Sequence, residues 1–180
     1  PQKIIVDGSQ LTLTYATPFT NNNYELTISN LSDLTSNLLD TVVLFDYFVA
    51  ANPKANEILI TEIFADPTPP IGLPDAEYIE LYNAGTEALE LENCTFSDGG
   101  TPATFPKKTL AAGAYLIVTK TGNESLFTSY GDVIGLDGLP ALNNGGDNLV
   151  LTNSDGLYLD QVNYTDESYQ DDIKKQGGYA

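Results

Sequence analysis

A loop with four prolines separates two runs of aliphatic and aromatic residues. This arrangement indicates that the two runs are β-strands. The runs extend from Glu57 to Phe64 and from Glu77 to Asn83. The intervening prolines, at positions 67, 69, 70 and 74, have no backbone N–H and cannot donate to a sheet ladder. We therefore predict two strands joined by a rigid surface loop.

Composition favours an all-β domain with many turns. The 180-residue chain has 42% hydrophobic residues, 15 glycines, 10 prolines and 11 tyrosines. Short runs rich in Val, Ile, Leu and Thr between glycines and prolines are typical of strands and turns. This hydrophobic content is enough for a core. No apolar run reaches the roughly 18 residues that a membrane helix requires, so no membrane span is predicted.

The missing residue types exclude several kinds of catalytic site. Without histidine, the chain cannot build a Ser-His-Asp triad, a Cys-His pair or an imidazole-bound zinc site. Cys94 is the single cysteine, which excludes an internal disulfide and a thiolate cluster. Its strand-like context, LENCTF, predicts a buried and unreactive thiol.

Acidic residues dominate the charge. The chain carries 25 acidic residues and seven lysines, with no arginine, and its formal net charge is −18. Phosphate backbones are repelled by such a chain, so nucleic acid is not an expected partner. Two interpretations of the charge stay open: a soluble, self-repelling surface, or a surface that acts together with cations.

Several motifs in order resemble a known family. The segments are ITEIFADP, EYIELYNAGTEALELENCTFSD, LAAGAYLIVT and LNNGGDNLVLTNSDGLYLDQVNY, between Glu57 and Tyr164. Together they resemble the lamin tail domain, an immunoglobulin-like β-sandwich of nuclear lamins and of many secreted bacterial proteins. The type found in surface and secreted proteins of Bacteroidetes is the nearer likeness. The resemblance implies an all-β immunoglobulin-like sandwich of the lamin tail type.

Additional strands are predicted ahead of this sandwich. LTLTYA and YELTISNL alternate as strands do, Asn21 to Asn23 suggest a turn, and TVVLFDYFV reads as a last strand. This order resembles the C-terminal half of a bacterial Ig-like domain. Half a sandwich leaves an open face and an unpaired edge. Either the other half has been removed, or these strands pack against the second domain.

Three segments follow from these patterns. Residues 1–52 are predicted to form the partial Ig-like part, and the small, polar stretch AANPKAN is the candidate linker. Residues 53–165 form the lamin-tail-like sandwich. Residues 166–180 form a polar C-terminal tail, which we expect to be loosely ordered unless a further strand anchors it.

Two local features are predicted within the sandwich. A short helix from Glu124 to Tyr130 is expected, with Asn123 as its cap. NLVLT and LYLDQVNY around NSDG predict a hairpin. Its apolar phase shifts between Leu159 and Val162, which indicates a bulge near Asp160 and Gln161 and a structural role for Asp160.

The proline-rich loop is a candidate calcium site. Asp66, Asp75 and Glu77 bracket it, and calcium is bound by several carboxylate and carbonyl oxygens. The alternative is that Asp66 caps a turn before Pro67 while Glu77 faces solvent. No other cofactor is expected. Gly146 and Asp147 lie in NNGGDNLVL, which looks like one calcium-binding glycine repeat, but a single copy cannot build stacked turns, so we predict a structural turn.

Glu62 and Glu80 lie inside apolar strands, where an unpaired charge is costly. Because the chain has few cations, we expect backbone N–H groups, Asn83 or tyrosine hydroxyls to hold them. Both glutamates are interpreted as structural, with partner binding as the alternative.

The predicted function is a non-catalytic accessory module. The resemblance favours an extracellular or cell-surface location within a larger exported protein, where neighbouring domains accompany it and it binds a protein or glycan surface. The alternative is a fragment of a carboxylate- and metal-dependent hydrolase. Glu77 and Glu80 are three residues apart on a strand and would point to opposite faces, a poor geometry for that chemistry.

Overall fold

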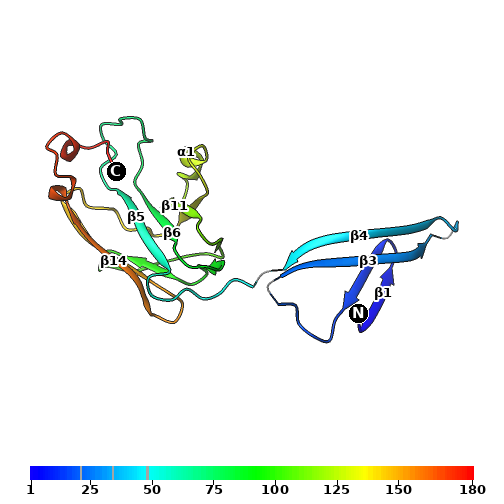
Figure 1. Cartoon of the computed structure of the whole chain (residues 1–180). Helices are drawn as coiled ribbons and strands as arrows, with labels where there is room; N and C mark the ends of the chain where they lie inside the picture. Colours follow the sequence, from blue (N-terminus) through cyan, green and yellow to red (C-terminus); the bar gives the residue numbers. More distant parts are fainter. Residues whose placement is uncertain (21, 34, 48) are drawn as a thin grey trace. The chain divides into compact units, whose positions relative to one another are not determined.

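The computed structural model of the chain describes residues 1–20, 22–33, 35–47 and 49–180. The chain divides into two compact units, Pro1–Val49 and Ala50–Ala180, which we call unit 1 and unit 2 (Figure 1).

Unit 1 consists of two antiparallel hairpins. They pair β1 (Lys3–Asp7) with β2 (Gln10–Thr14), and β3 (Asn22–Ser32) with β4 (Leu38–Tyr47). Asn22 and Asn23 are the first residues of β3, so the turn predicted at these two positions is wrong, and Asn21 lies outside the described residues.

Unit 1 buries little of its apolar surface. Phe19 contacts the rings of Tyr15, Tyr24, Phe45 and Tyr47 at centroid distances of 4.8 to 5.7 Å. None of its residues whose exposure is described is buried. Large hydrophobic side chains are instead exposed on both hairpins, at Ile4, Ile5, Val6, Leu11, Leu31, Leu38, Leu39, Val42, Val43 and Leu44. Because folding is driven mainly by burial of apolar surface, these hairpins have a weak driving force of their own.

Unit 2 is a sandwich of two four-stranded sheets, with a small two-stranded sheet beside them. One sheet has the order β12-β11-β6-β5 and the other β14-β13-β8-β9. The elements are β5 (Ile58–Phe64), β6 (Tyr78–Asn83), β7 (Leu89–Glu90), β8 (Thr95–Ser97), β9 (Ala103–Thr104), β10 (Thr109–Leu110), β11 (Tyr115–Lys120), α1 (Glu124–Phe127), β12 (Val133–Leu136), β13 (Gly146–Thr152), β14 (Tyr158–Thr165), and the 3₁₀ helices η1 (Asp166–Tyr169) and η2 (Lys174–Gln176).

The core lies between the two large sheets. Ile79 and Leu81 alternate with outward residues on β6, and Leu149 and Leu151 do the same on β13. All four are fully buried in one cluster that also contains Phe96. Complete burial of such a side chain contributes about 1.5–3 kcal/mol. The predicted all-β, immunoglobulin-like sandwich is confirmed.

β5 is an edge strand of one large sheet, and β14 is an edge strand of the other. Each of the two strands contains a bulge. In β5, Thr61 is the extra residue between the pairs Ile60–Leu81 and Glu62–Glu80. In β14, Leu159 is the extra residue, one position before the predicted Asp160 and Gln161. A bulge shifts the inward phase by one residue, so Ile63 packs against the core and Glu62 lies on the other face of its sheet.

Helical structure is shorter than predicted. The α-helix ends at Phe127 instead of Tyr130, and Asn123 at its N-cap makes no side-chain capping bond. The Glu124 carboxylate instead accepts the Gly122 N–H at 2.7 Å. No helix within the described ranges is long and apolar enough to cross a membrane.

Unit 1 buries few apolar side chains and unit 2 buries many, and separate expression of the two units tests the consequence of this difference. Residues 50–180 should unfold in one cooperative thermal transition, because all the buried hydrophobic side chains found among the described residues lie in this unit. Residues 1–49 alone should show no cooperative transition. Circular dichroism melting curves of both fragments provide the measurement, and a sigmoidal melt of residues 1–49 would contradict the expectation.

Candidate functional site

The loop between β5 and β6 does not assemble the predicted calcium site. Thr68 lies between two of the candidate ligands: its N–H donates to Asp66 at 3.4 Å and its hydroxyl donates to Asp75 at 3.2 Å. Glu77 instead accepts the Leu142 N–H at 3.2 Å. Among the described residues, no group of three acidic or cysteine side chains is placed to hold a metal ion.

Glu77 is half-buried, so its carboxylate is less exposed than the alternative to the calcium site expected. Burial raises its pKa above the ordinary value of 4.5, and the nearby Asp66 carboxylate raises it further. The Leu142 N–H and the Lys120 ammonium act in the opposite direction. The carboxylate therefore connects β6 to the segment that precedes β13, at an electrostatic cost.

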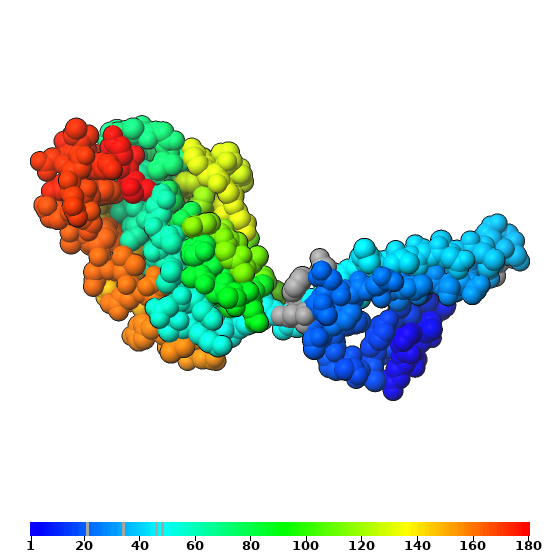
Figure 2. All heavy atoms as spheres, viewed as in Figure 1, coloured from blue at the N-terminus to red at the C-terminus, as the bar shows by residue number. Residues whose placement is uncertain are grey.

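The C-terminal segment packs on the same loop. The Gly178 N–H donates to the Asp66 carbonyl at 2.7 Å. Both Gly177 and Gly178 have positive φ, and a Cβ at either position would overlap a carbonyl, of Thr68 or of Pro69. Figure 2 shows this segment, in red, against the blue-green loop. The two glycines permit a close approach of the tail to the loop that sequence pattern alone does not reveal.

Glu62 and Glu80 are direct cross-strand neighbours on the outer face of their sheet. The Tyr78 hydroxyl donates to Glu62, and the Thr61 hydroxyl donates to Glu80 at 2.8 Å. Burial raises the pKa of Tyr78, and the bond to Glu62 raises it further, so the phenol stays protonated as a donor. In the described part of the chain, neither glutamate forms a salt bridge.

Asn83 is a buried connection at the end of β6. Its amide donates to the carbonyls of Glu87 and Leu110 at 2.9 and 2.8 Å. Its side-chain oxygen accepts the Gly85 N–H at 2.9 Å. A fully buried amide with all these partners joins three segments. In the described part of the chain, the Asn83 side chain forms no hydrogen bond with Glu62 or Glu80.

Gly146 and Asp147 shape the start of β13. Gly146 has φ of 133°, and a Cβ there would lie 2.6 Å from the Tyr164 carbonyl oxygen. Asp147 accepts the Asn143 side-chain amide at 2.9 Å. These contacts describe a turn that leads into a strand.

Asp160 links the two sheets. One carboxylate oxygen accepts the Ile60 N–H of β5 at 2.7 Å, and the other accepts the Gln161 N–H at 2.8 Å. Next to this link, the Asn56 N–H donates to the Leu159 carbonyl at 2.9 Å. These bonds hold β5 and β14 together near Ile60 and Asp160.

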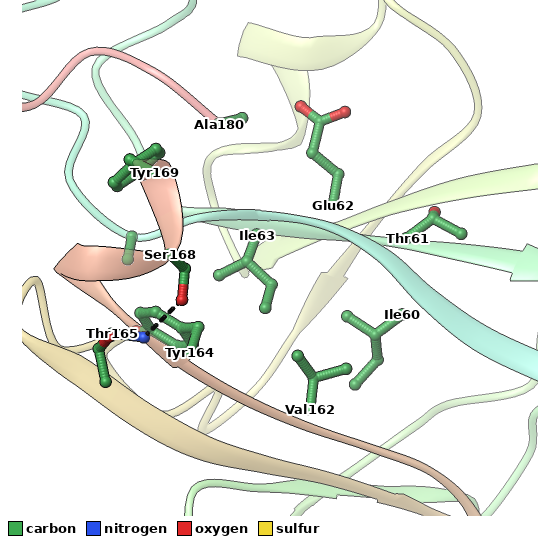
Figure 3. A pocket seen from close by; sticks show the side chains of 11 residues that line it. Ile60, Thr61, Glu62, Ile63, Val162, Tyr164, Thr165, Ser168, Tyr169 and Ala180 are labelled. Atoms are coloured by element: carbon green, nitrogen blue, oxygen red, sulfur yellow. Dashed lines mark hydrogen bonds between the residues drawn. The ribbon is translucent and has the colours of Figure 1, made fainter. Parts of the chain in front are cut away.

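Beyond the Asp160 link, an open groove of about 280 Å³ lies between β5 and β14. Figure 3 shows Ile60 and Val162 facing each other across it, with Ile63 and Tyr164 alongside. Glu62, Thr165, Ser168, Tyr169 and Ala180 are among the residues at its rim. The groove thus combines an apolar floor with a polar rim.

Sequence reasoning missed this groove and the buried Asn153. Asn153 donates to the Pro53 carbonyl at 2.9 Å and accepts the N–H groups of Asp155 and Leu157. The turn sequence NSDG was the available signal for Asn153. The groove had no local signal, because its two walls are about 100 residues apart in sequence. Cys94 is buried, which raises the pKa of its thiol to about 11.

Comparison with known families agrees with this architecture. The lamin tail domain model matches residues 51–166, more than half of the chain. The chain belongs to the lamin tail domain family. A search of curated proteins finds no match. The matched lamin tail domain contains both β5 and β14, whereas Ser168, Tyr169 and Ala180 at the rim of the groove follow it in sequence.

Removal of the Tyr78 hydroxyl should destabilise the lamin tail domain. Tyr78→Phe leaves the half-buried Glu62 carboxylate without its donor, which should lower the free energy of unfolding by about 1–3 kcal/mol. Tyr82→Phe is the matched control, because the Tyr82 ring packs against Tyr115 in a tilted arrangement and its hydroxyl forms no hydrogen bond with the described residues. Urea denaturation at neutral pH measures both. Equal effects of the two substitutions would argue against the Glu62–Tyr78 bond.

Glu77 should make stability depend on pH. Its raised pKa means that the folded state binds the proton more tightly than the unfolded chain, so stability falls as pH rises above 4.5 through the folded pKa. Glu77→Gln keeps an oxygen acceptor for Leu142 and removes this contribution. Relative to wild type, the variant should gain stability at pH 7 and lose the gain near pH 4.

Urea denaturation across this pH range provides the measurement for Glu77. Glu87→Gln is the control for the change in net charge, since Glu87 is exposed. The same pH dependence in both variants would assign the effect to overall charge and contradict the role of Glu77.

Proposed function

We propose that this chain is a non-catalytic binding and attachment module, exposed outside the cytoplasm as part of a larger exported protein. The lamin tail domain would bind a partner surface, and unit 1 would contribute neighbouring Ig-like strands. The observation that carries the proposal is the groove between β5 and β14, with its apolar floor and polar rim. Concave apolar sites with a few polar groups are typical binding sites.

The arrangement of carboxylates supports a non-catalytic role. Hydrolysis by paired carboxylates needs two of them on either side of one scissile bond. Glu77 and Glu80 bond to different parts of the domain, Leu142 and Thr61. Glu62 and Glu80 are neighbours, but each accepts a hydroxyl hydrogen bond, and the groove is lined by Glu62 without Glu80. The family is also generally non-enzymatic.

Charge and the resemblance to exported bacterial domains support the proposed location and partners. A net charge of −18 favours solubility and repels nucleic acid. A protein or a glycan is therefore the expected partner surface. The candidate calcium site is not part of this proposal, because the described residues Asp66, Asp75 and Glu77 do not form a group that could hold a metal ion.

A binding screen with the full chain tests the proposal. The immobilised chain is exposed to surface and secreted proteins and to a glycan array, with calcium and with EDTA. We expect saturable binding to at least one protein or glycan that EDTA does not reduce. Surface labelling of intact producing cells should detect the chain.

Two results would contradict the proposed function. One is the absence of saturable binding in both buffers. The other is turnover of glycosides or phosphoesters that is lost in both Glu62→Gln and Glu80→Gln, since these changes remove the two neighbouring carboxylates but keep hydrogen-bond acceptors.

A further inference from the structure

We propose that Asn144 is a site of covalent modification by water, which converts its side-chain amide to a carboxylate and releases ammonia. The reaction passes through a five-membered succinimide ring and yields aspartate or isoaspartate at this position. Asn144 lies in the turn that leads into β13. The inference goes beyond the proposed binding function and does not depend on it.

The reaction uses only the chain and water. The backbone nitrogen of Gly145 attacks the side-chain carbonyl carbon of Asn144, and the carbon–nitrogen bond of the carboxamide breaks. The amide nitrogen leaves as ammonia, with the proton that the Gly145 nitrogen gives up. Water then opens the ring at one of its two carbonyl carbons. Opening at the side-chain carbonyl gives aspartate, and opening at the main-chain carbonyl gives isoaspartate.

The first requirement is steric, and glycine meets it. A side chain on the residue after an asparagine hinders the approach of that residue's nitrogen to the carboxamide. Asn144 and Gly145 are the only Asn-Gly pair in the sequence. Both residues are exposed, and a Cβ built on Gly145 would meet no atom within 4 Å. The surroundings therefore leave room for the ring to form.

The second requirement is that both reacting groups are free. With the residues that the structure describes, neither the Asn144 side chain nor the Gly145 N–H forms a hydrogen bond. The turn is closed by its outer residues instead, because the Gly146 N–H donates to the Asn143 carbonyl at 3.0 Å. The nitrogen can thus reach the carboxamide without first breaking a hydrogen bond of the protein.

Asn153 has the opposite environment, although the small residue Ser154 follows it. Its side chain is buried, and its amide donates to the Pro53 carbonyl at 2.9 Å. Its side-chain oxygen accepts the N–H groups of Asp155 and Leu157, both at 2.9 Å. Attack on this carboxamide requires the loss of buried hydrogen bonds. Asn153 is therefore expected to stay unmodified and is an internal control.

The isoaspartate product lengthens the main chain by one carbon atom at a place where both neighbours are held. Before it, the Asn143 side-chain amide donates to Asp147 at 2.9 Å. After it, Gly146 lies so close to β14 that a Cβ would be 2.6 Å from the Tyr164 carbonyl oxygen. The extra atom must therefore displace Asn143 or distort the start of β13.

Displacement of Asn143 would reach the groove between β5 and β14. The Tyr164 hydroxyl donates to the Asn143 carbonyl at 2.8 Å, and burial raises the pKa of Tyr164, so the phenol stays protonated as a donor. Tyr164 lines the groove (Figure 3). Isoaspartate would thus release a side chain of the groove wall. Aspartate keeps the original main chain and leaves this bond in place.

Ageing of the full chain at mildly alkaline pH tests the modification. Peptide mapping by mass spectrometry detects the exchange of NH₂ for OH at each asparagine. We expect the product at Asn144 and none at Asn153. Gly145→Ala should slow the reaction at least about tenfold. The variant should fold, because Gly145 has no positive φ and its Cβ meets open space.

Gly131→Ala is the matched control for the change of glycine to alanine. Gly131 is also exposed, has no positive φ and leaves open space for a Cβ, but it follows a tyrosine. This variant should modify Asn144 at the rate of the original chain. Melting curves of both variants confirm that each is folded.

Resonances of the Tyr164 ring test the structural consequence. They should shift in the isoaspartate form of isotope-labelled protein, which enzymatic methylation of isoaspartate identifies. Asn144→Asp is the control, because it adds the same charge without lengthening the main chain. It should leave the Tyr164 ring resonances unchanged.

Two sets of results would overturn the inference. Modification that is no faster at Asn144 than at Asn153, or that Gly145→Ala does not slow, would exclude Asn144 as the reactive site. Unchanged Tyr164 resonances in the isoaspartate form, or an equal shift in Asn144→Asp, would exclude the displacement of Asn143. Neither set depends on the outcome of the binding screen.

Discussion

A shortage of cations determines how this protein holds its carboxylates. With 25 acidic residues and seven lysines, most carboxylates cannot form ion pairs within the chain. The lamin tail domain gives the partly buried ones neutral donors instead: the Tyr78 hydroxyl for Glu62, the Thr61 hydroxyl for Glu80, and backbone N–H groups for Asp160 and Glu77. Hydrogen bonds to a charged acceptor are stronger than neutral ones, but they require a fixed geometry. The positions of these donors therefore depend on the local strand geometry.

The bulges provide that geometry. Thr61 is an extra residue in β5, and this single insertion places Ile63 against the core and Glu62 on the outer face beside its tyrosine donor. If the same sequence formed a regular strand in which Thr61 was paired instead of bulged, the two-residue period would direct the Glu62 carboxylate toward the core, at a cost of several kcal/mol for an unpaired charge. The second bulge, at Leu159, precedes Asp160, whose carboxylate then reaches the Ile60 N–H on the other sheet. Core packing, carboxylate satisfaction and the link between the sheets thus depend on the same two irregularities.

The sequence was sufficient for the fold and insufficient for the site. Alternation and turn residues identify most strands of the sandwich, and the shift from Leu159 to Val162 indicates the bulge in β14 to within one residue. The bulge in β5 was not predicted, although Ile60 and Ile63 show the same three-residue spacing. Proximity in sequence was misleading for the acidic loop, because Glu77 turns toward Leu142, 65 residues away. The docked tail and the groove depend on contacts between distant segments, which local patterns do not specify.

An open strand edge is a risk as well as a binding opportunity, since it can pair with any exposed strand, including that of another copy. In β5 and β14, bulges interrupt the regular ladder, and local side chains occupy the N–H groups of Ile60, Gln161 and Thr165. Carboxylates near the groove repel other copies of this acidic chain. What these devices leave open is a short part of the β5 edge at Ile63, above an apolar floor and beside Glu62, because the next outward residue, Ala65, is buried. The same charge that discourages self-association would favour a basic partner over an acidic one, because attraction and exclusion arise from one surface.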